Sequence, residues 1–286
     1  MKVIIIYDDD FLFLGAITMS SLFGPDVWIA FAVTFLAGLA TLVGGAIVLF
    51  FKQPSFRLLS FGLAFSGGAM VYVSLTEILN KSWHSFSEIF QDKVAYAYAT
   101  FAFLAGVILV LLLDRFVPNP HTMVEKSANL QLDQAQIRRT ALLTLLAITA
   151  HNFPEGLATF FATLDSPTLG TPLAVAIAIH NIPEGIAIAV PVYIATKKKS
   201  IAIMASLLSG LAEPFGAALG YFVLAPFLGP MVYGIVFGLI AGVMVYLSLD
   251  ELLPTAKRYS KGHETVYGLV SGMAALALSL VLFRFV

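Results

Sequence analysis

Two copies of one polar motif occur in an otherwise apolar chain. The pattern His-Asn-x-Pro-Glu-Gly runs from His151 to Gly156 and again from His180 to Gly185. Side chains four residues apart share one face of an α-helix, so each histidine is expected beside the glutamate of its own motif. Residues three apart are also neighbours, which brings each asparagine to the same glutamate. The motif therefore predicts, on each of two helices, a glutamate flanked by an imidazole and an amide.

These residue types are ligands for divalent transition metals. If the two helices face each other, one site would combine two imidazoles with two carboxylates, a set that suits Zn²⁺. A neighbouring site would offer only oxygen ligands and would hold a transition metal more weakly. The candidates for the first site are His151, Glu155, His180 and Glu184, and those for the second are Asn152, Glu155, Asn181 and Glu184, with Glu213 as a further candidate. Because the chain has no cysteine, thiolate sites are excluded.

A proline accompanies each of these carboxylates. Pro154, Pro183 and Pro214 lack the N–H group of an ordinary residue, so the carbonyl four residues before each one loses its helical partner. Irregular backbone at membrane depth is tolerated where it lines a cavity. The prolines are therefore expected to bend the helices at the level of the ligands.

The segments that carry these motifs are long and apolar enough to cross a membrane. Hydrophobic residues make up 59% of the 286 residues and charged residues 12%, about half the charged share of an ordinary soluble domain. Runs of about twenty apolar residues predict membrane-spanning helices. We expect eight, at residues 28–51, 57–79, 94–113, 140–164, 172–195, 201–224, 231–253 and 266–285. The expected fold is an all-α integral membrane domain over residues 27–286, preceded by an N-terminal tail at 1–26.

The distribution of positive charge predicts how these spans are oriented. Twelve of the sixteen lysines and arginines fall in the connections after the first, third, fifth and seventh spans, including the longest connection at 114–139. Such connections normally face the cytoplasm, which places both termini outside. The protein is therefore expected to be a multi-pass protein of the cell membrane, inner or plasma. The net charge of −1 offers no basic domain for binding nucleic acid.

The chain also repeats itself. Residues 70–77 in the second span read Met-Val-Tyr-Val-Ser-Leu-Thr-Glu and match Met-Val-Tyr-Leu-Ser-Leu-Asp-Glu at 244–251 in the seventh. Two three-span units separated by two spans would have inverted orientations, a plan typical of alternating-access transporters with a site near the midplane. The matching acids Glu77, Asp250 and Glu251 have two interpretations: stations where the ion enters and leaves, or interfacial charges at helix ends.

Two functions are compatible with metal ligands inside a membrane. A transporter would bind and release the ion, whereas an intramembrane zinc-dependent hydrolase would use it to activate water. The His-Glu-x-x-His pattern of zinc proteases is absent, and a hydrolase needs neither an inverted repeat nor a second, all-oxygen site. The pattern therefore favours a transporter over an enzyme.

The doubled motif, together with Gly-Leu-Ala-Glu-Pro at 210–214 and Leu-Asp-Glu-Leu-Leu-Pro at 249–254, resembles the ZIP (Zrt/Irt-like) family of metal transporters from about residue 30 onward. The resemblance implies import of Zn²⁺ in the main, with tolerance for Fe²⁺, Mn²⁺, Co²⁺ and Cd²⁺ and no cofactor beyond the transported ions. It implies a two-metal centre with ligands His151, Asn152, Glu155, His180, Asn181, Glu184 and Glu213. It also implies a homodimer in the lipid bilayer, in which spans one, four, five and six slide against the other four.

Overall fold

The computed structural model describes residues 23–50, 56–115, 134–283 and 285, and every element within these ranges is helical. The α-helices are α2 (Pro25–Ile47), α3 (Phe56–Val73), α4 (Leu79–Ser87), α5 (Asp92–Asp114), α7 (Gln134–Asp165), α8 (Pro167–Thr196), α9 (Lys199–Gly210), α10 (Ala212–Leu224), α11 (Pro230–Leu247), α12 (Leu253–Tyr259) and α13 (Glu264–Phe283). Two π-helical segments, η2 (Ser74–Ile78) and η4 (Ser248–Leu252), join α3 to α4 and α11 to α12. The short 3₁₀ segments are η1 (Val48–Phe50) and η3 (Ala225–Phe227).

The expected all-helical membrane fold is confirmed. Among the described residues, seven helical stretches are long and apolar enough to cross a membrane: Pro25–Ile47, Arg57–Ser87, Asp92–Asp114, Gly170–Thr196, Lys199–Phe227, Pro230–Tyr259 and Glu264–Phe283. The remaining long helix is α7, with 32 residues, whose polar motif and basic first turns make it less apolar than the others. The arrangement as eight spans with an inverted repeat stays a prediction.

Some predicted boundaries differ from the helices, and others cannot be compared. Helix α7 already begins at Gln134, inside the connection expected at 114–139, whereas residues 116–133 of that connection lie outside the described part of the chain. Nearly all of the expected tail at 1–26 lies outside it too. The second span was expected to end at residue 79, but the helical stretch continues to Ser87.

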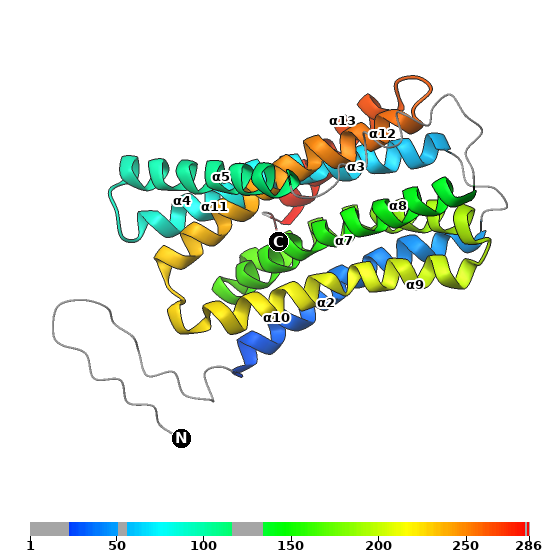
Figure 1. Ribbon diagram of the computed structural model, residues 1–286. Helices are drawn as coiled ribbons and strands as arrows, with labels where there is room; N and C mark the ends of the chain where they lie inside the picture. Colours follow the sequence, from blue (N-terminus) through cyan, green and yellow to red (C-terminus); the bar gives the residue numbers. More distant parts are fainter. Residues whose placement is uncertain (1–22, 51–55, 116–133, 284, 286) are drawn as a thin grey trace.

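The helices pack in two layers (Figure 1). One layer contains α2, α7, α8, α9 and α10, and the other contains α3, α4, α5, α11, α12 and α13. The layers meet where α3 lies against α8 and where α11 lies against α7. This division separates the helices of spans one, four, five and six from those of the other four.

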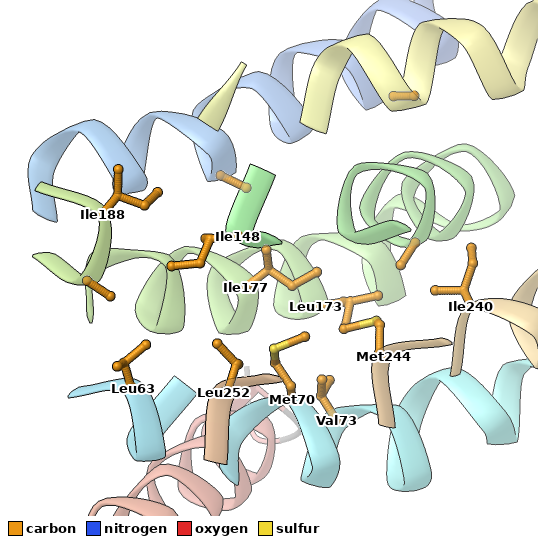
Figure 2. Packing of buried hydrophobic residues seen from close by; sticks show 14 of the residues in the cluster. Leu63, Met70, Val73, Ile148, Leu173, Ile177, Ile188, Ile240, Met244 and Leu252 are labelled. Atoms are coloured by element: carbon orange, nitrogen blue, oxygen red, sulfur yellow. The ribbon is translucent and has the colours of Figure 1, made fainter. Parts of the chain in front are cut away.

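Apolar side chains fill the seam between the layers (Figure 2). The seam is lined from one layer by Leu63, Met70, Val73, Ile240, Met244 and Leu252, and from the other by Leu173 and Ile177, all of them buried. Lipid chains are as apolar as these residues, so close packing rather than removal from water holds membrane helices together.

Glycines of the repeated motif bring neighbouring helices into backbone contact. A Cβ atom on Gly156 of α7 would collide with the backbone of Glu213 at the start of α10. A Cβ atom on Gly185 of α8 would collide with the backbone of Thr41 in α2. Small residues permit this kind of approach between membrane helices. The motif that supplies the candidate ligands therefore also sets the spacing of the helices around them.

Candidate metal centre

The seven predicted ligands lie deep inside the layer that contains α7 and α8. None of their side chains is more than 2% exposed. They are His151, Asn152 and Glu155 from α7, His180, Asn181 and Glu184 from α8, and Glu213 from the start of α10. One ligand atom each from His151, Glu155 and Glu184 lies within 4.8 Å of the other two. The structure thus brings side chains of both motif copies to one place, an arrangement that the helical spacing within each motif does not specify.

The three prolines affect their helices differently. Pro154 and Pro183 lie inside α7 and α8, whose helical course continues on both sides. Before Pro214, in contrast, α9 ends at Gly210 and α10 begins at Ala212. Of the three prolines, all within the described residues, only Pro214 therefore follows an interruption of the helix at the level of the ligands.

His180 and Glu155 connect the two motif helices. Nδ1 of His180 lies 3.1 Å from the carbonyl oxygen of Ala176, which can only accept, so Nδ1 carries a proton. Nε2 of the same ring lies 3.0 Å from Oε1 of Glu155. A hydrogen bond between these two atoms requires a second proton, on the imidazole or on the carboxyl group. A metal ion bound to both atoms would take the place of that proton.

Both asparagines have their amide groups oriented by neighbouring helices. Nδ2 of Asn152 donates to the carbonyl oxygen of Ser209 at 3.0 Å. Nδ2 of Asn181 donates to the carbonyl oxygen of Ala37 at 3.0 Å and to Oε1 of Glu213 at 2.6 Å. Backbone carbonyls only accept, so in each case the amide nitrogen must face them. The Oδ1 atom of each asparagine is left without a hydrogen-bond partner.

Unpaired oxygen atoms are concentrated in this cluster. They are Oδ1 of Asn152 and Asn181, Oε2 of Glu155 and Glu213, and both carboxylate oxygens of Glu184. A buried polar atom without a partner costs on the order of 1–3 kcal/mol, and more when it is charged. Such atoms in a native protein call for an explanation such as a bound ion or water. Together with two imidazoles, these oxygens form a donor set suited to divalent cations.

Residues of the other layer also reach the cluster, and the motif alone did not reveal them. Sδ of Met70 in α3 lies 2.8 Å from Nε2 of His151 and 3.7 Å from Oγ of Ser248. Oγ of Ser66 donates to the carbonyl oxygen of His180 at 2.8 Å. Met70 and Ser248 both belong to the repeated segments 70–77 and 244–251, so that repeat was the available signal.

The acids at matching repeat positions lie in the two π-helical segments. Glu77 is in η2, and Asp250 and Glu251 are in η4. All three side chains are partly buried, and helix continues beyond each segment, so they lie inside long helical stretches rather than at their ends. Single π turns often occur at functional sites. Both interpretations of these acids, as stations for the ion or as interfacial charges, stay predictions.

Membrane-length helices in two layers around a buried histidine, asparagine and glutamate cluster define a multi-pass membrane protein with an internal polar centre. The family model described as ZIP Zinc transporter matches residues 119–280, which is more than half of the chain. This chain therefore belongs to the ZIP zinc transporter family.

Relatives match over almost the whole chain. "Zinc transporter ZupT" of Stenotrophomonas maltophilia (strain K279a) is 65% identical over 261 residues, covering 91% of this chain and 97% of the relative. The protein of that name from Neisseria meningitidis serogroup B (strain MC58) is 62% identical over 259 residues, or 90% and 96% of the two chains. The one from Chlorobaculum parvum is 47% identical over 262 residues, or 89% and 97%.

Proposed function

We propose that this protein carries divalent metal ions, Zn²⁺ in the main, across the cell membrane through the centre formed by α7, α8 and α10. Its family consists of transporters rather than enzymes, which favours this function over an intramembrane hydrolase. Its relatives are named zinc transporters. The observation that carries the proposal is the group of buried, unpaired carboxylate and amide oxygens beside two imidazoles.

Two adjacent ions would share the central glutamates. The first would be held by His151, Glu155, His180 and Glu184, and the second by Asn152, Asn181, Glu155, Glu184 and Glu213. The oriented amides support the second site, because each one directs an unpaired oxygen away from the helix that holds its nitrogen. All-oxygen ligands bind a transition metal less tightly than imidazoles do, so the second site would exchange its ion more readily.

Charge balance explains why a loaded centre could move through the bilayer. Glu155 and Glu184 together neutralise one divalent ion, and Glu213 offsets half the charge of a second, which lowers the cost of holding these charges at low dielectric. Without metal, protons such as the one between His180 and Glu155 would take its place. Sliding of the α7 and α8 layer against the other layer would then alternate access to the centre, in the import direction. The same proposal includes a homodimer, outside termini and tolerance for Fe²⁺, Mn²⁺, Co²⁺ and Cd²⁺.

Uptake of radioactive ⁶⁵Zn²⁺ into sealed proteoliposomes tests the proposal. The variant is Glu155→Gln with Glu184→Gln, which preserves side-chain shape and removes both central charges. The matched control is Glu88→Gln, which neutralises an exposed carboxylate. Saturable uptake should be present in the wild type and the control and lost in the folded double variant. Stoichiometric zinc binding without uptake by the wild type would overturn transport and favour a hydrolase.

A further inference from the structure

An ion pair joins the two layers at the end of the bundle where α4 leads to α5 and α7 leads to α8. Nζ of Lys81 in α4 lies 3.8 Å from Oδ2 of Asp165, the last residue of α7. The side chain of Lys81 is only 11% exposed and that of Asp165 is 36% exposed. Helices α4 and α7 belong to different layers. The pair therefore spans the seam along which the layers would slide.

Aromatic rings extend this contact across the seam. Nζ of Lys81 lies 5.6 Å from the ring centroid of Phe237 in α11. Phe237 stacks on Tyr233, with centroids 6.0 Å apart, and Tyr233 meets Phe161 of α7 edge to face at 6.1 Å. We call Lys81, Asp165, Phe237, Tyr233 and Phe161 the clasp. Lys81, Phe237 and Tyr233 belong to one layer, and Asp165 and Phe161 belong to the other. The clasp therefore joins the layers at its two ends, through Lys81 with Asp165 and through Tyr233 with Phe161.

The clasp lies between the metal centre and one end of the bundle. Phe161 and Asp165 follow Glu155 by six and ten residues on the same helix. At a rise of about 1.5 Å per residue, they lie roughly 9 and 15 Å along α7 from that ligand. A metal ion moving between Glu155 and this end of the seam must therefore pass the level of the clasp.

A lysine at this level needs its partner for electrostatic reasons. A buried ammonium without a counter-ion is strongly unfavourable, and it would also repel an approaching divalent cation. Asp165 and Glu77, one helical turn before Lys81, are the acidic groups whose charges act on it. With Asp165 in contact, Lys81 can remain largely buried, whereas separation of the layers would require Lys81 to reach water.

We propose that the Lys81–Asp165 pair is a latch that closes this end of the seam and must open for the metal ion to pass. The inference rests on the proposed transport function. By the distribution of lysine and arginine, this end faces outward. The latch is closed in this structure, and it opens when α7 moves against α4 and α11.

Cross-linking tests the latch directly, because the chain has no cysteine of its own. A Lys81→Cys, Asp165→Cys protein is treated with a short, reducible bifunctional thiol reagent and reconstituted for ⁶⁵Zn²⁺ uptake. The control is Arg57→Cys with Glu264→Cys, which replaces an ion pair of 3.4 Å between α3 and α13 of one layer. Cross-linking should slow zinc uptake by the test protein by about tenfold or more, and reduction of the cross-link should restore that uptake. Uptake by the control protein should not change. Unchanged uptake by a verified cross-linked test protein overturns the latch.

Hydrogen exchange of single variants provides a test that does not depend on transport. Lys81→Met leaves behind a carboxylate that is partly exposed, whereas Asp165→Asn leaves a buried ammonium without its partner. Exchange in residues 79–87 and 158–165 should therefore rise in both, and more in Asp165→Asn, by roughly tenfold. Arg57→Gln should leave these segments unchanged. If both folded variants exchange hydrogen in these segments at the wild-type rate, the latch is overturned. Absence of zinc uptake by the wild type would instead refute the transport function alone.

Discussion

Replacing Gly156 with alanine would test whether backbone contact between α7 and α10 sets the geometry of the metal centre. The new Cβ would lie 2.5 Å from both the carbonyl carbon and the Cα atom of Glu213, where ordinary contact begins at 3.4 Å. Both obstacles are backbone atoms, which no change of rotamer can move aside. The two helices must therefore separate by about 1 Å, at a cost of about 1–3 kcal/mol in the free energy of unfolding.

That separation acts directly on the candidate ligands. Glu155 precedes Gly156 on α7, and the side chain of Glu213 moves with α10. A displacement of about 1 Å in a positioned site can reduce its function by on the order of a hundredfold. We therefore expect Gly156→Ala to weaken zinc binding by roughly ten- to a hundredfold and to slow uptake comparably.

The assay is calorimetric titration with Zn²⁺ in detergent, followed by ⁶⁵Zn²⁺ uptake by the same preparation. Gly229→Ala is the matched control, because nothing lies within 4 Å of a Cβ at that position and its φ of 175° is open to any residue. Wild-type zinc affinity in folded Gly156→Ala would refute the reasoning. An equal loss in Gly229→Ala would show that the effect does not come from this contact.

Three further predictions concern single contacts at the centre. Metal bound to Nε2 of His180 and Oε1 of Glu155 should displace the proton between these two atoms; calorimetry in buffers of different ionisation enthalpy would detect the released proton, and no release would contradict this prediction. Asn181→Leu removes the donor to Glu213 and Ala37 and should cost about 1–3 kcal/mol of stability; it should also reduce the bound zinc from two ions to one, which a titration of stoichiometry checks. Met70→Leu removes the thioether beside His151 at similar side-chain volume, so in a competition assay uptake of Cd²⁺ should fall more than uptake of Zn²⁺. Equal reductions in the uptake of both ions would show that Met70 acts through packing instead.

The sequence alone determined the class of fold and the chemistry of the candidate ligands. Apolar runs of membrane length and the spacing of His, Asn and Glu are local features, and helical geometry converts them into spans and shared faces. In the structure, residues of both motif copies lie in one buried cluster on α7 and α8. The ends of helices were harder to predict from the sequence. Helix α3, for example, continues through a π turn into α4, and no sequence signal marks this continuation.

Only the tertiary structure decided which groups meet between helices. The approach of Met70 to His151 and the Asn152 bond to Ser209 join residues 81 and 57 positions apart. The pairing of Lys81 with Asp165 likewise joins α4 to α7 across the seam. Such contacts depend on the rotation and crossing of whole helices, which result from packing along their full length. A local pattern defines the face of one helix, but it does not specify which atom of another helix will lie against it.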